Sequence, residues 1–157
     1  YYALKGDSKS FSKEQENYLK FIELAQKEQF AKFLYFKSTI CFENQAPITD
    51  SLLEDVNNSL IQMLTIRNTL HNIEIDFYYF YLALEFYQKS NQLGKLLGIC
   101  NEAEELMRIN PSAFTNTRKI IIMLFKLSAL LSTKQFKEGV DLIKNGVSMS
   151  MKLFSCK

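Results

Sequence analysis

Proline and glycine are scarce in this 157-residue chain, which holds two Pro and five Gly. A β protein of this length would need more turn-forming residues, so their scarcity favours long helices joined by short connections. Apolar residues make up 47% of the chain and charged residues 23%, which is typical of a globular protein rather than a disordered one. The composition therefore predicts one all-α domain with a sizeable core.

Histidine and clustered cysteine are also lacking. His71 is the only histidine, which excludes a His-based metal cluster, and it lies at a predicted helix junction with no nucleophile fixed nearby. Cys41, Cys100 and Cys156 are far apart and have no CxxC spacing. We interpret them as reduced thiols of a cytoplasmic protein, in preference to a disulfide or a metal site. We expect no catalytic site, no metal and no cofactor.

Long apolar runs and basic clusters are missing as well. The longest uncharged apolar run, Phe77–Leu84, has eight residues, whereas a membrane-spanning helix needs about 20. Lys and Arg are scattered, the formal net charge is +2, and no more than two basic residues are adjacent. A nucleic-acid surface needs a basic stripe. We therefore expect a soluble chain with no membrane span and no direct nucleic-acid partner.

The most apolar stretch of the sequence is Ile73–Lys89. From Phe77 to Tyr87 every residue except Glu85 is apolar or aromatic. A helix that is hydrophobic all round is packed on several sides, so this segment is predicted to be the central helix of a stack. Asn72 is suited to cap its first turn.

Further helices are predicted on both sides of this segment. Capping boxes begin at Ser12 and Ser51. A change in the direction of the apolar stripe near Glu28 favours two helices before residue 43, and one long helix over 12–43 is the alternative. Gly94 and Gly98 are attributed to close approach of helices. The predicted helices cover residues 12–27, 30–42, 51 to 68–71, 92–109 and 135–152, after a helix tail at 1–5. A further helix starts at Ser112 or Thr115 and ends near Thr133. Because this tail has no preceding helix and the first residue is not Met, we expect a piece of a longer or processed protein.

The helices recur at a fixed interval. Ser38, Ala83 and Ser128 are 45 residues apart, and apolar or aromatic residues precede and follow each of them in register. The second helices recur with a shift of 43, which aligns Leu93 with Phe136. A period of this length with two helices per unit is typical of an α-solenoid. The predicted units are residues 1–28, 29–71, 72–111 and 112–152. The sets in register are Leu34, Tyr79 and Leu124; Tyr35, Phe80 and Phe125; and Cys41, Phe86 and Leu131.

The helix-pair pattern resembles the tetratricopeptide-repeat (TPR) family. Residues Tyr2–Asp7 resemble the turn of that family, in which an aromatic residue stands four positions before Gly-Asp, and Tyr87–Asn91 repeats the spacing. Asn110-Pro111 resembles its closing Asn-Pro. The family unit has about 34 residues, whereas the interval here is 43 to 45. HEAT-type repeats share the longer period and are the second structural interpretation.

The resemblance implies a right-handed α-α superhelix, a TPR-like solenoid of about seven helices in antiparallel pairs. It implies a non-enzymatic scaffold module that binds a protein or peptide, as the sensory or interaction part of a larger regulatory protein. The first helix of each pair would line the concave surface, where a row of aromatic residues suits an extended peptide or an amphipathic helix. The candidate groove residues are Tyr35, Phe42, Phe77, Phe80, Tyr87 and Phe125. The alternative is that these side chains form the core between repeats.

A function of another class stays open at this point. A compact helical bundle could bind a small apolar ligand or a peptide signal in its interior. The acidic group Glu102, Glu104 and Glu105 is interpreted as a solvated helix face. An exposed end of a solenoid is sticky, so the sequence also allows a homodimer through one end.

Overall fold

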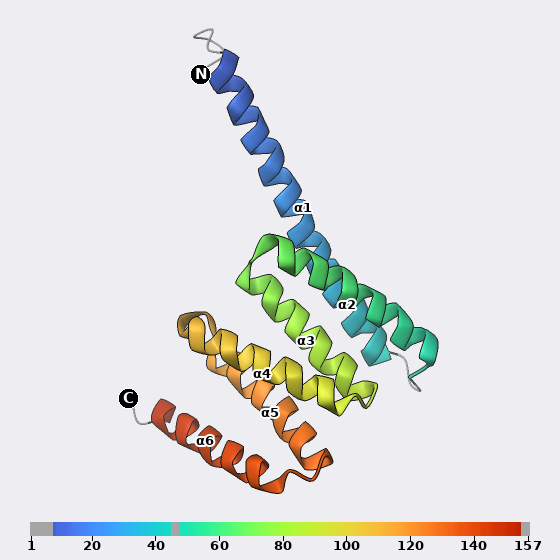
Figure 1. Ribbon diagram of the computed structural model, residues 1–157, viewed down its shortest axis with the longest axis vertical. Helices are drawn as coiled ribbons and strands as arrows, with labels where there is room; N and C mark the ends of the chain where they lie inside the picture. Colours follow the sequence, from blue (N-terminus) through green and yellow to red (C-terminus); the bar gives the residue numbers. More distant parts are fainter. Residues whose placement is uncertain (1–7, 45–47, 155–157) are drawn as a thin grey trace.

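The protein is an array of α-helices, seen here in a computed structural model that describes residues 8–44 and 48–154. Within these residues there are six α-helices, one 3₁₀ turn and no strand. Each helix packs against the next in chain order, which confirms the all-α solenoid (Figure 1). The predicted tail at residues 1–5 lies outside the described residues. The elements are α1 (Ser8–Asn44), α2 (Asp50–Leu70), α3 (Ile73–Lys89), α4 (Leu93–Ile109), η2 (Pro111–Ala113), α5 (Asn116–Ser132) and α6 (Phe136–Phe154).

The division of the first segment into two helices was wrong, because α1 is one helix of 37 residues. No Gly or Pro interrupts it, and the ion pair Lys32–Glu28 (2.8 Å) stabilises the helix at the predicted break. The change in stripe direction reflects two apolar faces on one helix. The predicted unit boundary at 28/29 therefore falls inside α1, and its first half projects beyond the other helices (Figure 1).

Side-chain caps set three of the helix starts. Asn72 accepts a hydrogen bond from the backbone N–H of Glu74 (2.8 Å) and begins α3 as predicted. Thr115 accepts from the N–H of Arg118 and begins α5. The predicted start at Ser51 was wrong, because Thr49 caps α2 by accepting from the N–H of Leu52 (3.2 Å). The start predicted at residue 12 was also wrong, since α1 already includes Ser8.

The turns that join α3 to α4 and α5 to α6 are copies of each other, 43 residues apart. Asn91 and Lys134 are both left-handed, with φ of 56° and 60°. The N–H of Gln92 donates to the carbonyl of Tyr87 at 2.8 Å, and the N–H of Gln135 donates to that of Leu130 at 2.8 Å. Side-chain bonds repeat too, since Gln92 Nε2 donates to Ser90 Oγ and Gln135 Nε2 donates to Thr133 Oγ1, each at 3.0 Å. The two hairpins therefore share one turn design.

α3 is the central helix of the array, as predicted. It contacts α1, α2, α4 and α5. Its residues Phe77, Phe80 and Ala83 are at most 1% exposed. In each set of residues that recur in register, the member on α3 is buried, whereas the members on α5, for example Leu124, are half-buried or exposed. In the described residues the hairpin α3/α4 packs between the other two hairpins, which accounts for the greater burial of its members.

Close approach does not explain the glycines of α4. A Cβ added at Gly94 or Gly98 would meet nothing within 4 Å, so that interpretation was wrong. The tight position is Gly146 on α6, where an added Cβ would lie 2.3 Å from Met123 Cε. Cys41 and Cys100 are free thiols, and burial raises the pKa of Cys100 to about 12. None of the helices in the described part of the chain has both the length and the apolar character needed to cross a bilayer.

Candidate functional site

One stripe of α3 is left open by its neighbours. Glu74, Tyr78, Tyr81, Glu85 and Gln88 recur at alternating intervals of four and three residues, which places them on one side of the helix. All five are half-buried or exposed, whereas the residues between them are mostly buried. The central helix of the array therefore presents two tyrosines and two carboxylates on this side.

Side chains from α1 and α5 border this stripe. The Tyr35 ring of α1 lies 5.1 Å from the Tyr78 ring, measured between centroids. On the other side, Gln88 Nε2 donates to Ser128 Oγ of α5 at 3.1 Å. The first helices of the three hairpins thus form one continuous surface. We call it the α3 face and define it by Tyr35, Glu74, Tyr78, Tyr81, Glu85 and Gln88.

Glu85 is the polar group of the α3 face that lacks a partner. Its Oε2 atom is buried and makes no hydrogen bond. Burial raises the pKa of Glu85, Lys89 lowers it, and Glu43 raises it further. A buried carboxylate oxygen without a donor is unfavourable. A rotation of the Glu85 side chain that brings this oxygen to an N–H or O–H group of a ligand would remove that penalty.

The tyrosines on either side of Glu85 are suited to contact a partner. Burial raises the pKa of both Tyr35 and Tyr81, so their hydroxyl groups stay protonated at neutral pH and can donate hydrogen bonds. Tyrosine offers a rigid apolar ring together with a polar tip, which explains its enrichment at interfaces. The α3 face can therefore combine apolar contact with a small number of directed hydrogen bonds.

The six predicted groove residues do not share one environment. Phe42, Phe77 and Phe80 are at most 5% exposed and belong to the hydrophobic core. For these three side chains the structure agrees with the alternative, the core between repeats. Phe77 lies under the guanidinium of Arg118, 3.6 Å from Cζ to the ring centroid, so its ring is covered from outside.

The other three predicted residues are half-buried. Tyr35 lies on the α3 face. Tyr87 contacts Phe86, with ring centroids 5.3 Å apart, and Lys95 Nζ lies 5.6 Å from its ring centroid. Phe125 packs against the core from α5. Sequence reasoning missed Tyr78, Tyr81 and Glu85, although Glu85 is the only polar residue in the apolar run and its spacing to Glu74 and Gln88 matches a helix face.

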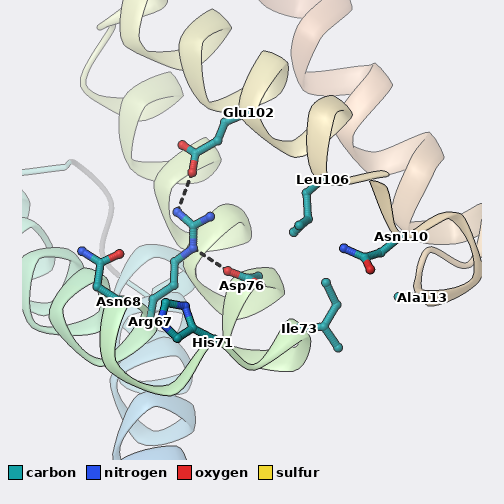
Figure 2. Close-up of a pocket in the computed structure, with 9 residues that line it drawn as sticks. All are labelled: Arg67, Asn68, His71, Ile73, Asp76, Glu102, Leu106, Asn110 and Ala113. Atoms are coloured by element: carbon teal, nitrogen blue, oxygen red, sulfur yellow. Dashed lines mark hydrogen bonds and ion pairs between the residues drawn. The ribbon is translucent and has the colours of Figure 1, made fainter. Parts of the chain in front are cut away.

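A pocket separate from the α3 face lies where α2, α3 and α4 meet (Figure 2). It is a cleft of about 520 Å³ next to the η2 turn. Figure 2 shows the guanidinium of Arg67 between the carboxylates of Asp76 and Glu102. The residues that line it are Arg67, Asn68, His71, Ile73, Asp76, Glu102, Leu106, Asn110 and Ala113.

Two nitrogens of Arg67 bond carboxylates within the protein. Its Nε lies 2.5 Å from Asp76 Oδ1 and its Nη1 lies 2.6 Å from Glu102 Oε1. Its Cζ also lies 4.8 Å from the Tyr79 ring centroid and 4.7 Å from that of Phe80. Burial lowers the pKa of Arg67, but the two carboxylates outweigh this effect and raise it overall. Arg67 therefore acts as a clamp that joins α2, α3 and α4.

The acidic side chains of α4 are 35–54% exposed, in line with the expected solvated face, and they also make ion pairs. Glu102 bonds Arg67 of α2, and Glu104 bonds Lys126 of α5 at 2.6 Å. Glu105 pairs within its own helix, with Arg108. Two of the three carboxylates therefore connect neighbouring hairpin helices. His71 ends α2 in the left-handed conformation, with φ of 46°, and its side chain is on the rim of the cleft.

Comparisons with known proteins add no family to this description. Among residues 8–44 and 48–154, no group of three or more His, Cys, Asp or Glu side chains is placed to hold a metal ion. The sequence matches no family model, no curated protein and no solved structure. Among the described residues, the α3 face combines tyrosine rings with a buried carboxylate oxygen that makes no hydrogen bond.

Proposed function

We propose that this chain is a non-enzymatic scaffold module with TPR-like repeats, and that it binds a segment of a partner protein or a peptide on the α3 face. The observation that carries the proposal is the unpartnered Glu85 oxygen between tyrosines, on a helix whose other sides are covered. Such an arrangement is unfavourable in the isolated chain and is relieved by a ligand donor.

Two features support the TPR-like part of the proposal. The hairpins α3/α4 and α5/α6 share the same turn geometry at an interval of 43 residues. The first helices contact one another in a row, α1 with α3 and α3 with α5. In TPR-like solenoids the first helices line the surface that receives the ligand, and the α3 face lies on this row.

The chemistry of the face suggests the kind of segment it binds. Rings of Tyr35, Tyr78 and Tyr81 favour apolar and aromatic side chains, whereas Glu85 favours a lysine, an arginine or a hydroxyl donor. An amphipathic helix or an extended peptide with one basic residue among apolar ones meets both demands. The free thiols Cys41 and Cys100 suit a reducing compartment. We place the module in the cytoplasm, as the interaction part of a larger regulatory protein.

A peptide selection tests the proposal. Random peptides are displayed and selected on the immobilised chain, and the Kd of the best binders is measured by fluorescence anisotropy. The double variant Tyr78→Ala/Tyr81→Ala should weaken binding at least about 10-fold, as truncation of central aromatic contacts does. Glu85→Gln should weaken the binding of those peptides that carry a basic residue.

The matched control is Ile61→Ala on α2, which removes an exposed apolar side chain outside the α3 face. It should leave the Kd unchanged. Circular dichroism shows whether each variant keeps its helices. Binders that lose no affinity in the folded Tyr78→Ala/Tyr81→Ala variant would place the binding surface elsewhere and would overturn the proposal.

A further inference from the structure

α1 carries a second apolar stripe that is largely exposed, although its Phe36 contacts Tyr78 of α3, with ring centroids 6.2 Å apart. Its buried seam, Ala31, Leu34, Ser38 and Phe42, faces the other helices. At 100° per residue, a set of large side chains falls on the opposite side of α1, and Tyr18, Phe33 and Phe36 in this set are 54–65% exposed. The stripe runs from the projecting half of α1 into the half that packs on the array. We call it the outer stripe: Tyr18, Ile22, Ala25, Phe33, Phe36 and Ile40.

The spacing of residues along the outer stripe is the same in both directions from Gln29. Ala25 and Phe33 lie four residues on either side of Gln29, Ile22 and Phe36 lie seven residues away, and Tyr18 and Ile40 lie eleven residues away. Intervals of three and four that return every eleven residues match a nearly straight helix, at about 3.67 residues per turn. A stripe with this symmetry is complementary to itself when a second copy runs antiparallel to the first.

We infer that this chain forms an antiparallel homodimer through α1, with a two-fold axis at Gln29. In this register each residue of the stripe faces a residue of another type on the partner. Phe33 faces the partner's Ala25, and Phe36 faces the partner's Ile22. A small residue opposite a large one lets the helices approach evenly. The contact is isologous, as in most homodimers, and it closes without leaving a free end for further copies.

The charges that border the outer stripe fit the same register. Glu28 and Lys32 flank it and form an ion pair of 2.8 Å within the helix. In the antiparallel pair, Lys32 lies only about 3 Å along the axis from the level of the partner's Glu28, at a rise of about 1.5 Å per residue. Two such contacts, related by symmetry, would replace or bridge the internal pairs. A parallel pair would instead place like charges at the same height.

The size of the stripe is sufficient for a specific contact. Aromatic side chains at 54–65% exposure offer roughly 100 Å² each, and the six stripe positions offer roughly 450 Å² per copy. The pair would thus bury roughly 900 Å² from the stripe alone, and flanking residues such as Leu19 and Phe21 raise this above the roughly 1,000 Å² of a specific interface. Because the seam and the stripe lie on opposite sides of α1, the partner would lie away from α2, and it would border α3 where Phe36 contacts Tyr78.

Mass measurement on the full 157-residue chain tests the inference. Sedimentation equilibrium should give twice the 18.3 kDa of one chain. Ala25→Glu should raise the dimer Kd at least about 100-fold, since each dimer would bury two unpaired carboxylates. Leu24→Glu is the matched control, because Leu24 is the adjacent residue, is exposed and points away from the outer stripe. It should leave the Kd within about twofold.

A cysteine scan tests the orientation. Only position 29 meets itself across an antiparallel axis, so Gln29→Cys should form an intermolecular disulfide. Ile22→Cys should not, because the two copies of residue 22 would be about 21 Å apart along the axis. The parent chain measures the background from the native cysteines.

Three outcomes overturn the inference: a parent chain that is monomeric at all concentrations, an equal effect of Ala25→Glu and Leu24→Glu, and equal cross-linking from positions 22 and 29. These tests measure the mass of the assembly and the cross-links between two copies of α1. Their failure is therefore distinguishable from a failure of peptide binding on the α3 face.

Discussion

Replacing Arg67 by methionine should destabilise the array more than the loss of any exposed ion pair. The side chains of Arg67 and Asp76 are 16% and 14% exposed. Removing the guanidinium leaves the Asp76 carboxylate partly buried without its partner, which costs about 3–5 kcal/mol when a buried pair is broken. The stacking of Arg67 on Tyr79 and Phe80 is lost as well. For a chain of this size we expect a fall in Tm of roughly 6–12 °C for a loss of about 3 kcal/mol.

A double-mutant cycle isolates the clamp from the rest of the side chain. The free energy of unfolding is measured by urea titration, followed by circular dichroism at the helix band, for Arg67→Met, Asp76→Asn and the double variant. The two changes should be non-additive by about 1–3 kcal/mol, because the double variant leaves no unpaired charge at position 76.

Arg108→Met is the matched control for this cycle. The pair Arg108–Glu105 is as short as Arg67–Glu102, at 2.6 Å, but its side chains are 73% and 54% exposed, so its loss should leave the free energy of unfolding nearly unchanged. A cost for Arg67→Met below that of Arg108→Met, or strict additivity in the cycle, would refute the clamp.

Three further predictions concern single positions. Phe80→Ala should lower the free energy of unfolding in urea by about 3–5 kcal/mol, because Phe80 is fully buried. An unchanged free energy would contradict its place in the core. Gly98→Ala should raise stability by up to about 1 kcal/mol in the same assay, because the site has open space, and destabilisation would show a hidden contact. Burial raises the pKa of Glu85 above 4.5, so the parent loses stability as the pH rises through that folded-state pKa. Glu85→Gln should therefore be more stable than the parent at pH 7 and equal to it near pH 4, and a variant that is less stable at pH 7 would contradict the assignment.

Much of the fold could be predicted from the sequence, because local signals set most helix ends. Asn72 and Thr115 are suitable caps before apolar segments, and α3 to α6 begin and end close to the expected residues. The error at the start of α2 has a local cause. Ser51 and Thr49 are both good capping residues, and only the hydrogen bond from the N–H of Leu52 decides between them.

The site was harder to predict, because periodicity shows which side chains are apolar and not which of them a neighbouring helix covers. Phe80 and Tyr81 are adjacent in the same apolar run, yet Phe80 is buried and Tyr81 is half-buried. The difference depends on the placement of the surrounding helices. The Arg67 clamp joins residues 9 and 35 positions apart. No local pattern in the sequence could indicate those partners.

Photo-cross-linking from the α3 face tests most directly the claim that this face receives a partner. Benzoylphenylalanine is placed at position 81 or, as the control, at position 61 on α2, and each protein is irradiated with a selected peptide. We expect a peptide adduct from position 81 and none from position 61. Adducts of equal yield from both positions, or from position 61 alone, would contradict it.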